Sequence, residues 1–207
     1  PHYFQRRLDG EPMSVLFIAN GTGFEVIGFN RLLVADDGAD QPFLYGGAIG
    51  QATLAEPVRQ AVVGWVEALV GALGLRGLNS LDFILDQGHA YLLEINARPS
   101  ATMSLYEAEC AGGWIGRHVG ACLGALPAAA PRPVARVYGH RIVYAPTDRR
   151  VPADLDWPDW CKDRSSAGTL VLRGAPLCTV VADGPGAGPV ESLLAVRGGT
   201  MLDLIAE

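Results

Sequence analysis

The sequence has 207 residues, of which 49% are hydrophobic, and its formal net charge is −6 at pH 7. A chain of this length can bury a sizeable core, in one large or two small domains. Its acidic balance argues against a nucleic-acid or anionic-membrane partner, and no apolar run reaches the roughly 18 residues that span a bilayer. We expect a cytoplasmic protein, whose four cysteines lack CxxC spacing and pack as reduced, small hydrophobic side chains.

The N-terminal part of the chain has the pattern of β-structure. Three strands are predicted, at Pro1–Asp9, Met13–Asn20 and Phe24–Ala35, and the pair Asn20-Gly21 is a strong hairpin signal. A polar loop over residues 36–40 follows them. Because the chain starts directly in a strand-like segment, we expect it to be a fragment of a longer polypeptide.

A glycine-rich segment and a helix come next. Phe43–Gly50 fits either a turn or a close approach of the backbone to a ligand, and both interpretations stay open. Thr53–Leu73 is predicted as an amphipathic helix that ends at Gly74, with Thr53 and Glu56 forming a capping box. The predicted buried stripe consists of Val58, Val62, Trp65, Leu69 and Leu73.

Two apolar strands joined by a turn follow the helix, and each contains one carboxylate. The strands are Ser80–Leu85 and Ala90–Ile95. A carboxylate inside an apolar strand is costly to bury unless a cation or a donor meets it. Asp82 lies in the first strand and Glu94 in the second, and Asn96 and Arg98 follow Glu94 at a period of two, which is the spacing of one sheet face.

Asp82 shares this face only if the turn sets the right register. A three-residue loop with Gly88 in the left-handed region would place Asp82 opposite Glu94, whereas a two-residue loop would send it to the other face; we predict the three-residue form. The resulting cluster of hard oxygen ligands suits Mg²⁺, which takes one or two carboxylates and shares phosphate oxygens. A core hairpin whose acids merely pair with Arg98 would leave the spacing of the three oxygen-bearing residues unexplained.

The C-terminal part begins after a second helix. That helix is predicted at Met103–Leu126, loosened by Gly112-Gly113, and Ala125–Pro133 is the best linker. We therefore predict one domain over residues 1–128 and a small β-rich domain with a terminal helix over 129–207. Its predicted elements are strands at Val134–Ala145, Gly168–Arg173 and Pro176–Ala182, a glycine-rich turn at Asp183–Gly188, and a helix at Val190–Ile205. His140 is interpreted as a structural strand histidine.

The acidic hairpin resembles the metal-binding hairpin of the ATP-grasp superfamily, in particular that of biotin carboxylase and its carboligase relatives. The matching residues are Asp82-Phe83, followed after the turn by Glu94-Ile95-Asn96-Ala97-Arg98. The resemblance implies an α+β fold in which an antiparallel sheet with helices forms the second half of an ATP-grasp domain. It also implies that Asp82, Glu94 and Asn96 hold Mg²⁺, with Mn²⁺ as an alternative, against the phosphates of ATP, and that Arg98 stabilises a charged acyl phosphate.

The resemblance also implies a nucleotide hinge near the start of the chain. In that family, backbone groups of a hinge strand bind adenine and an acidic residue binds the ribose. The matching positions here are the hinge Gln5-Arg6-Arg7-Leu8 and the acid Glu11. Ordinary surface polarity at a strand end is the other interpretation of Gln5 and Glu11, and it stays open.

By this resemblance, the protein is an ATP- and Mg²⁺-dependent ligase that joins a small carboxylate to an amine, or a carboligase, through an acyl phosphate. The fragment alone is expected to be inactive, because its partner is the N-terminal remainder of the same polypeptide; self-association is left open. The alternative is a degenerate ATP-grasp module that binds nucleotide or a partner without catalysis.

Overall fold

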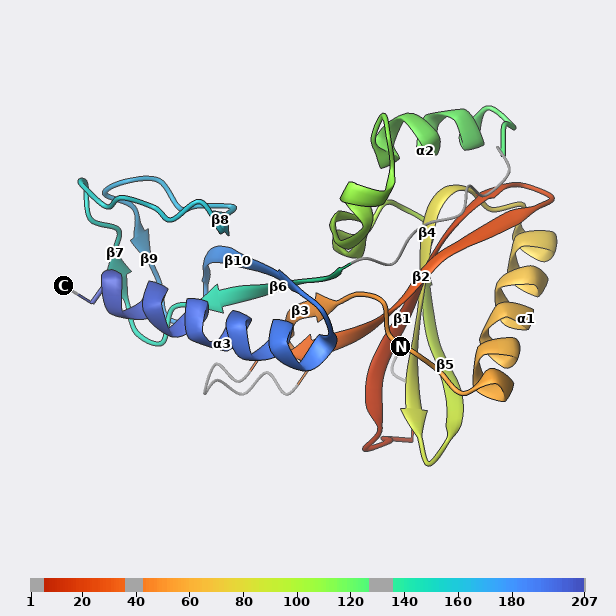
Figure 1. Ribbon diagram of the computed structural model, residues 1–207, viewed down its shortest axis with the longest axis horizontal. Coiled ribbons are helices and arrows are strands. Elements are labelled where there is room, and N and C mark those ends of the chain that lie inside the picture. Colours follow the sequence, from red (N-terminus) through yellow and green to blue (C-terminus); the bar gives the residue numbers. More distant parts are fainter. Residues whose placement is uncertain (1–5, 36–42, 127–135, 207) are drawn as a thin grey trace, which may run out of the picture. The chain divides into compact units, whose positions relative to one another are not determined.

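The computed structural model describes residues 6–35, 43–126 and 136–206 (Figure 1). The chain groups into two compact units, which we call the N-terminal unit (Pro1–Arg31 and Ala52–Arg132) and the C-terminal unit (Leu32–Gln51 and Pro133–Glu207). Residues 32–51 group with the C-terminal unit because the strand that they contain pairs there. The predicted division into domains at residue 128 stays a prediction.

Four antiparallel strands form the sheet of the N-terminal unit. They are β1 (Glu11–Asn20), β2 (Phe24–Val34), β4 (Arg76–Asp86) and β5 (His89–Asn96), in the order β5-β4-β1-β2. The Asn20-Gly21 hairpin is confirmed, since the Asn20 amide donates to the Gly23 carbonyl at 3.1 Å. In contrast, residues 6–9 form no strand, and the first five residues of the predicted strand Pro1–Asp9 lie outside the described residues.

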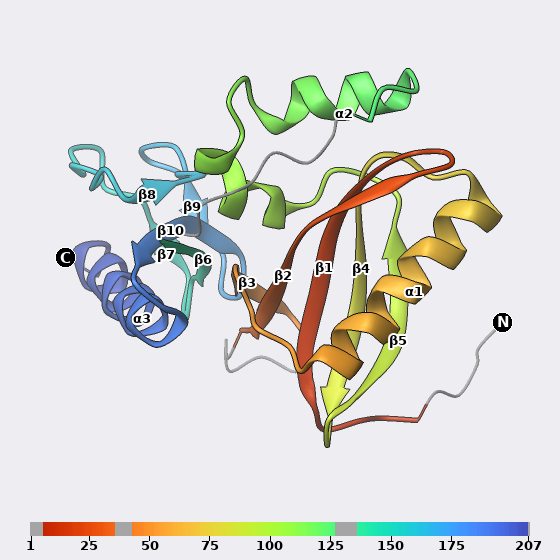
Figure 2. The ribbon, with the colours of Figure 1, turned by 45° about the vertical axis from the view of Figure 1, so that its right-hand side comes forward.

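Helix α1 (Glu56–Leu73) covers one face of this sheet (Figure 2). Its valines pack against alternate residues of β1 and β4, such as Phe17 and Phe83, which are fully buried. The predicted stripe is only partly right: the buried helical residues are Val58, Val62, Val66 and Val70, and Leu73 is 59% exposed. An i, i+4 row of valines therefore replaces the wider stripe with Trp65 and Leu69, which are half-buried at its border.

The sequence predicted the C-terminal end of α1 correctly but not its N-terminal end. Gly74 ends the helix as predicted, with φ of 61° and its amide bonded to the Val70 carbonyl at 3.0 Å. The predicted capping box is wrong, because the helix begins at Glu56 after Ala55 and no side chain caps it. Pro57 in the first turn provides the start signal instead, since its missing N–H is not needed there.

The second predicted helix is two elements, a 3₁₀ helix η1 (Ala101–Glu109) and α2 (Trp114–Cys122). The prediction of one helix from Met103 to Leu126 is wrong because Gly112 and Gly113 both have positive φ, at 87° and 79°, which a right-handed helix cannot contain. Tyr106 of η1 and Trp114 of α2 are buried, and the Trp114 indole donates to the Tyr106 carbonyl at 2.8 Å. This bond ties the two elements together across the break.

The main strands of the C-terminal unit lie in the order β3-β6-β10-β8 of an antiparallel sheet. The strands are β3 (Tyr45–Ile49), β6 (Val137–Tyr144), β10 (Pro176–Gly184) and β8 (Cys161–Lys162), and a separate ribbon pairs β7 (Arg149–Arg150) with β9 (Leu170–Val171). Helix α3 (Ala187–Leu204) packs on the sheet through Val190, Leu194 and Met201. The predicted α+β class with antiparallel sheets is confirmed.

The structure corrects two local predictions for this unit. The glycine-rich stretch Phe43–Gly50 is not a turn, because most of it is strand β3. Gly47 is required there: a Cβ would lie 2.2 Å from the His140 carbonyl oxygen of the paired strand. The predicted turn Asp183–Gly188 is also shorter, since β10 extends to Gly184 and α3 begins at Ala187. The polar loop over residues 36–40 and most of the predicted linker lie outside the described residues.

Within the described ranges, no helix has both the length and the apolar character needed to cross a membrane.

Candidate active site

The β4–β5 hairpin reaches the predicted pairing by a different route. Its loop has two residues, Gln87 and Gly88, with φ of 49° and 79°, so the predicted three-residue loop is wrong. A bulge compensates: Phe83 pairs with Leu92 while Asp82 pairs with Glu94, so that Leu93 is one extra residue in β5. The inserted residue reverses the effect of the shorter loop and brings Asp82 opposite Glu94.

Three polar side chains meet beside this bulge. The Asn96 amide nitrogen lies 3.3 Å from Asp82 Oδ2 and 3.3 Å from Glu94 Oε1, so it donates to both carboxylates. The strand ends at Asn96, and Arg98 turns back so that its guanidinium donates to Asn96 Oδ1 at 3.2 Å. The structure thus brings together all four residues that the hairpin pattern singled out.

Asp82 is in an electrostatically unfavourable place for a carboxylate. Burial and the neighbouring Glu94 charge raise its pKa from the ordinary value of 3.8 to about 6, and Arg98 and the Asn96 hydrogen bond only partly oppose this. A cation beside the pair would remove the repulsion between the two acids. The raised pKa therefore marks an acidic pair that the protein leaves short of positive charge.

The donor set fits a hard divalent cation. No three side chains of His, Cys, Asp or Glu converge anywhere in the described part of the chain, so the site has two carboxylates and one amide. Mg²⁺ is commonly held by one or two carboxylates, with water and phosphate oxygens completing its shell. Rotation of the Asn96 amide by half a turn would exchange the nitrogen facing both acids for an oxygen, which is a third ligand of the right chemistry.

A row of paired residues continues from this site across the sheet. Glu94 pairs with Asp82, Asp82 with Ser14, and Ser14 with Asn30, so these side chains share one face, opposite to α1. Ser14 and Asn30 are buried, and the Asn30 amide donates to Ser14 Oγ at 3.1 Å. The Tyr106 hydroxyl donates to Asn30 Oδ1 at 2.7 Å and also lies 3.1 Å from the Phe29 carbonyl oxygen.

Sequence reasoning missed this inner part of the row. The available signal was weak: Ser14 interrupts the apolar run of β1, and Asn30 interrupts β2. Both are small neutral residues that a strand can accommodate once they are hydrogen-bonded to each other. Gly28 leaves room for the Tyr106 hydroxyl in this network, because a Cβ at residue 28 would lie 2.3 Å from the hydroxyl oxygen.

The predicted nucleotide-binding residues are less well defined. Gln5 lies outside the described residues, Arg6 is exposed, and Leu8 is half-buried in irregular chain before β1. Glu11 is the first residue of β1, and its carboxylate lies 3.7 Å from the Arg31 guanidinium in a partly exposed ion pair. The roles of Gln5, Arg6, Leu8 and Glu11 stay predictions.

His140 lies in the C-terminal unit and has the character of a structural residue. It is 5% exposed, its Nε2 lies 2.7 Å from the Tyr45 hydroxyl, and burial lowers its pKa to about 4. It is therefore neutral at physiological pH. Cys161 and Cys178 of the same unit are buried free thiols, and burial raises the pKa of both.

Comparison with known proteins shows what this chain is similar to. Residues 2–102 match the model of the ATP-grasp domain. By sequence, no curated protein matches the chain. Several solved structures share its fold, and the chain spans half or less of the length of each one described below.

The L-amino acid ligase from Bacillus licheniformis is 19% identical with a TM-score of 0.70, over 92% of this chain and 50% of that chain. The biotin carboxylase domain of a single-chain bacterial carboxylase is 18% identical with a TM-score of 0.67, over 94% of this chain and 48% of that one. The biotin carboxylase domain of Hydrogenobacter thermophilus 2-oxoglutarate carboxylase, in complex with MgADP, ADP and bicarbonate, is 11% identical with a TM-score of 0.66, over 90% and 43%. Residues 2–102 thus match the ATP-grasp domain, and the chain shares its fold with an L-amino acid ligase and with biotin carboxylase domains, in agreement with the resemblance of the acidic hairpin.

Proposed function

We propose that this chain forms the second half of the catalytic domain of an ATP- and Mg²⁺-dependent ligase. The observation that carries the proposal is the pairing of Asp82 with Glu94 beside Asn96, whose amide bonds both carboxylates. The names of the structural neighbours, an amino acid ligase and several carboxylases, support a ligase. The MgADP complex of one of them supports ATP and magnesium as the cofactors.

In this proposal Asp82, Glu94 and Asn96 hold Mg²⁺ or Mn²⁺. The bound ion supplies charge neutralisation for the phosphates of ATP. Arg98 is the only cation of the cluster, and its guanidinium is exposed beyond Asn96, where it can donate to developing negative charge. Gln5, Arg6, Leu8 and Glu11 are proposed to line the adenine and ribose positions.

The reaction proposed is the joining of a carboxylate to an amine. A carboxylate is a poor electrophile, so its oxygen first takes the γ-phosphoryl group of ATP, giving an acyl phosphate and ADP. The amine then attacks the acyl carbon and inorganic phosphate leaves. The chemistry needs positioned donors and charge rather than a nucleophilic side chain, which agrees with the residue types present. The remainder of the catalytic domain is proposed to come from the N-terminal part of the same polypeptide.

Metal binding by this chain is the first test. Mn²⁺ can be titrated into the wild type, Asp82→Asn and Glu94→Gln and followed by electron paramagnetic resonance. We expect both variants to bind at least about tenfold more weakly, because each removes one anionic ligand. Asp86→Asn is the matched control, since Asp86 lies in the same strand next to the turn and outside the cluster. Equal Mn²⁺ affinity in the wild type and all three variants would contradict the proposed metal site.

Turnover is the second test and needs the full-length polypeptide. ADP release is measured with a panel of carboxylates and amines, for the wild type and the same variants. The ligase proposal expects release that depends on both substrates and is lost in Asp82→Asn. Binding of Mg²⁺ and ATP without ADP release from any substrate pair would instead identify a non-catalytic nucleotide-binding module.

A further inference from the structure

The C-terminal unit contains a cavity of about 260 Å³ that none of the proposed chemistry uses. It lies along β6 beside α3, and all of its lining residues belong to this unit. We propose that it binds a small organic anion, a carboxylate with an apolar body, through Arg141. This inference is independent of the proposed ligase function, which rests on the N-terminal unit.

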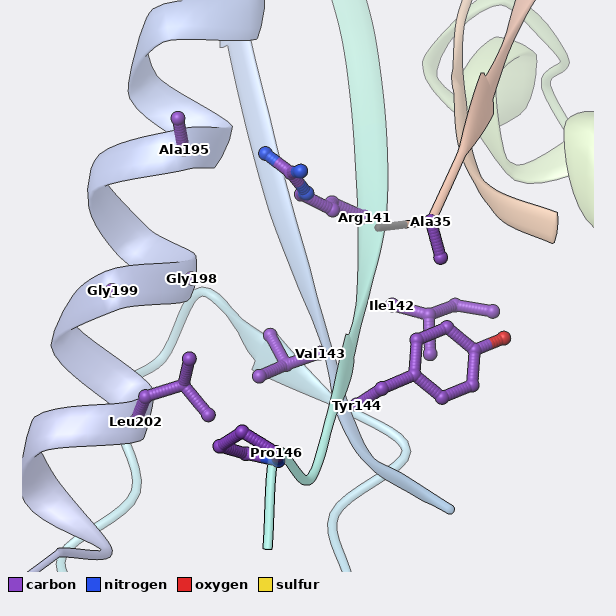
Figure 3. A pocket seen from close by; sticks show the side chains of 10 residues that line it. All are labelled: Ala35, Arg141, Ile142, Val143, Tyr144, Pro146, Ala195, Gly198, Gly199 and Leu202. Atoms are coloured by element: carbon purple, nitrogen blue, oxygen red, sulfur yellow. The ribbon is translucent and has the colours of Figure 1, made fainter. Parts of the chain in front are cut away.

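Arg141 is the charged group of the cavity. Figure 3 shows its side chain extending from β6 toward α3, level with Ala195. It is half-buried, and no side chain or carbonyl among the residues that the structure describes is bonded to its guanidinium. A guanidinium withdrawn from water loses hydration that only an anion or several acceptors can replace.

Four other arginines of the same unit have partners within the chain. Arg136 pairs with Asp183, Arg150 donates to the Gly168 carbonyl at 2.6 Å, and Arg164 donates to the Cys161 carbonyl at 2.9 Å. Arg197 donates to the Val181 carbonyl and also lies 5.2 Å from the Trp160 ring. Arg141 and Arg149 are half-buried without such a partner among the described residues, but only Arg141 lines the cavity. Its position in the cavity points to a partner that comes from outside the chain.

The walls around Arg141 are apolar. Val143 and Leu202 face each other from β6 and α3, Pro146 lies below them, and Tyr144 projects from the other side of β6 (Figure 3). The Tyr144 hydroxyl is already engaged, since it donates to the Tyr45 carbonyl at 2.8 Å. A ligand that meets these walls therefore needs an apolar body in addition to its charge.

Helix α3 leaves the space open by carrying two consecutive glycines. Glycine in a helix interior costs about 1 kcal/mol relative to alanine. No packing requirement explains Gly198 or Gly199: a Cβ at Gly198 would meet only the Val143 side chain, at 3.9 Å, and one at Gly199 would meet nothing within 4 Å. Larger residues at Gly198 would project into the cavity instead.

Charge and size together define the ligand. Arginine matches a carboxylate through two parallel hydrogen bonds, which favours a carboxylate over a neutral group. The cavity is smaller than the roughly 300–1,000 Å³ typical of sites for drug-sized molecules, which favours a small ligand. Phenylacetate is a suitable probe, because it combines one carboxylate with a compact apolar ring.

The test is a titration of the full chain with phenylacetate, followed by the NMR signals of the Val143 and Leu202 methyl groups. We expect saturable shifts in the wild type, and at least tenfold weaker binding in Arg141→Gln. Gly198→Leu should abolish binding while the protein remains folded, because the leucine fills the cavity. Arg149→Gln is the matched control, since Arg149 belongs to the same unit but does not line the cavity.

Three other probes separate the sources of affinity. Phenylacetamide lacks the charge, acetate lacks the ring and inorganic phosphate is an anion without an apolar body; each should bind at least tenfold more weakly than phenylacetate. Equal binding of phosphate, or unchanged binding in Arg141→Gln, overturns the proposal.

The lining residue Ala35 is followed in the sequence by Asp36 and Asp37, which are candidates for a partner of Arg141 within the chain. If phenylacetate binds only after both are changed to asparagine, the partner of Arg141 is this chain and the proposal is wrong.

Discussion

The row of paired residues across the N-terminal sheet has two ends that differ in one respect, namely how their polar groups are satisfied. At the inner end, Ser14 and Asn30 are neutral, buried and bonded to each other, and Tyr106 completes the network. At the outer end, Asp82 of β4 and Glu94 of the edge strand β5 are acids whose shared donor is the Asn96 amide.

The inner end contributes to stability, whereas the outer end is the proposed functional site. A neutral buried network whose members are all bonded fixes the packing of the elements that it joins. Two adjacent carboxylates do the opposite, since the charge of Glu94 raises the cost of ionising Asp82. The inner end therefore holds η1 against the sheet, and the outer end is suited to an external cation. Substitutions at the two ends should have opposite consequences.

The largest expected effect is the loss of activity in Asp82→Asn. In the full-length polypeptide, the proposed ligase turnover should fall by about 100-fold or more, because the proposed metal site loses an anionic ligand. The same variant without Mg²⁺ should unfold at a higher urea concentration at pH 7, because the repulsion from Glu94 is gone. ADP release and urea unfolding, measured on the same variant, check the two signs. A variant that lost both activity and stability would show that Asp82 has a structural role instead.

At the inner end, Tyr106→Phe should reduce stability without affecting metal binding. The change removes the hydroxyl that bonds Asn30 Oδ1, so a buried acceptor is left short of a donor at a cost of about 1–3 kcal/mol. Urea unfolding measures the loss, and Mn²⁺ affinity should not change. Tyr91→Phe is the matched control, since Tyr91 is 43% exposed. Similar losses in both variants would contradict the contrast between the two ends.

The pH dependence of stability should distinguish the outer end as well. The pKa of Asp82 is about 6 in the folded protein against an ordinary value of 3.8, so the folded state binds this proton more tightly than the unfolded state does. The contribution of Asp82 is therefore most favourable below about pH 4 and is lost as the pH rises through 6. The stability of Asp82→Asn relative to the wild type should increase across this window and then level off. Saturating Mg²⁺ should reduce the difference, and a constant difference from pH 4 to 7 would contradict the cause given for the shift.

The sequence predicted the outer end better than the inner one, for a physical reason. Acids in an apolar strand need an explanation, so Asp82 and Glu94 were conspicuous, and their separation limited the possible pairings. Ser14 and Asn30 needed a partner that only the tertiary structure reveals, since Tyr106 is distant in sequence and reaches them over Gly28.

Errors in the predicted elements have equally local causes. The bulge at Leu93 was invisible because Leu92 and Leu93 are both apolar, so strict alternation could not locate the extra residue. Strand β3 was missed because its glycines suggested a turn, whereas Gly47 is needed for close approach to β6. The helix α1 was predicted from its periodicity, but a valine row at i, i+4 and a wider stripe with Trp65 fit the same sequence.

The smallest expected effect concerns the two-residue turn that joins the strands of the acidic hairpin. Gln87 has φ of 49°, in the left-handed region that asparagine tolerates better than glutamine, and Asn-Gly is the preferred pair in turns with positive φ at both central residues. Gln87→Asn should therefore stabilise the protein by about 0.5 kcal/mol. Gly88→Ala should lower stability by about 1 kcal/mol; nothing lies within 4 Å of the added methyl group, so its φ of 79° is the only source of strain. Urea unfolding measures both changes, and Mn²⁺ affinity should be the same in both variants because the bulge at Leu93 lies between the turn and the acids. A change of affinity in either variant would show that the turn, and not the bulge, holds Asp82 opposite Glu94.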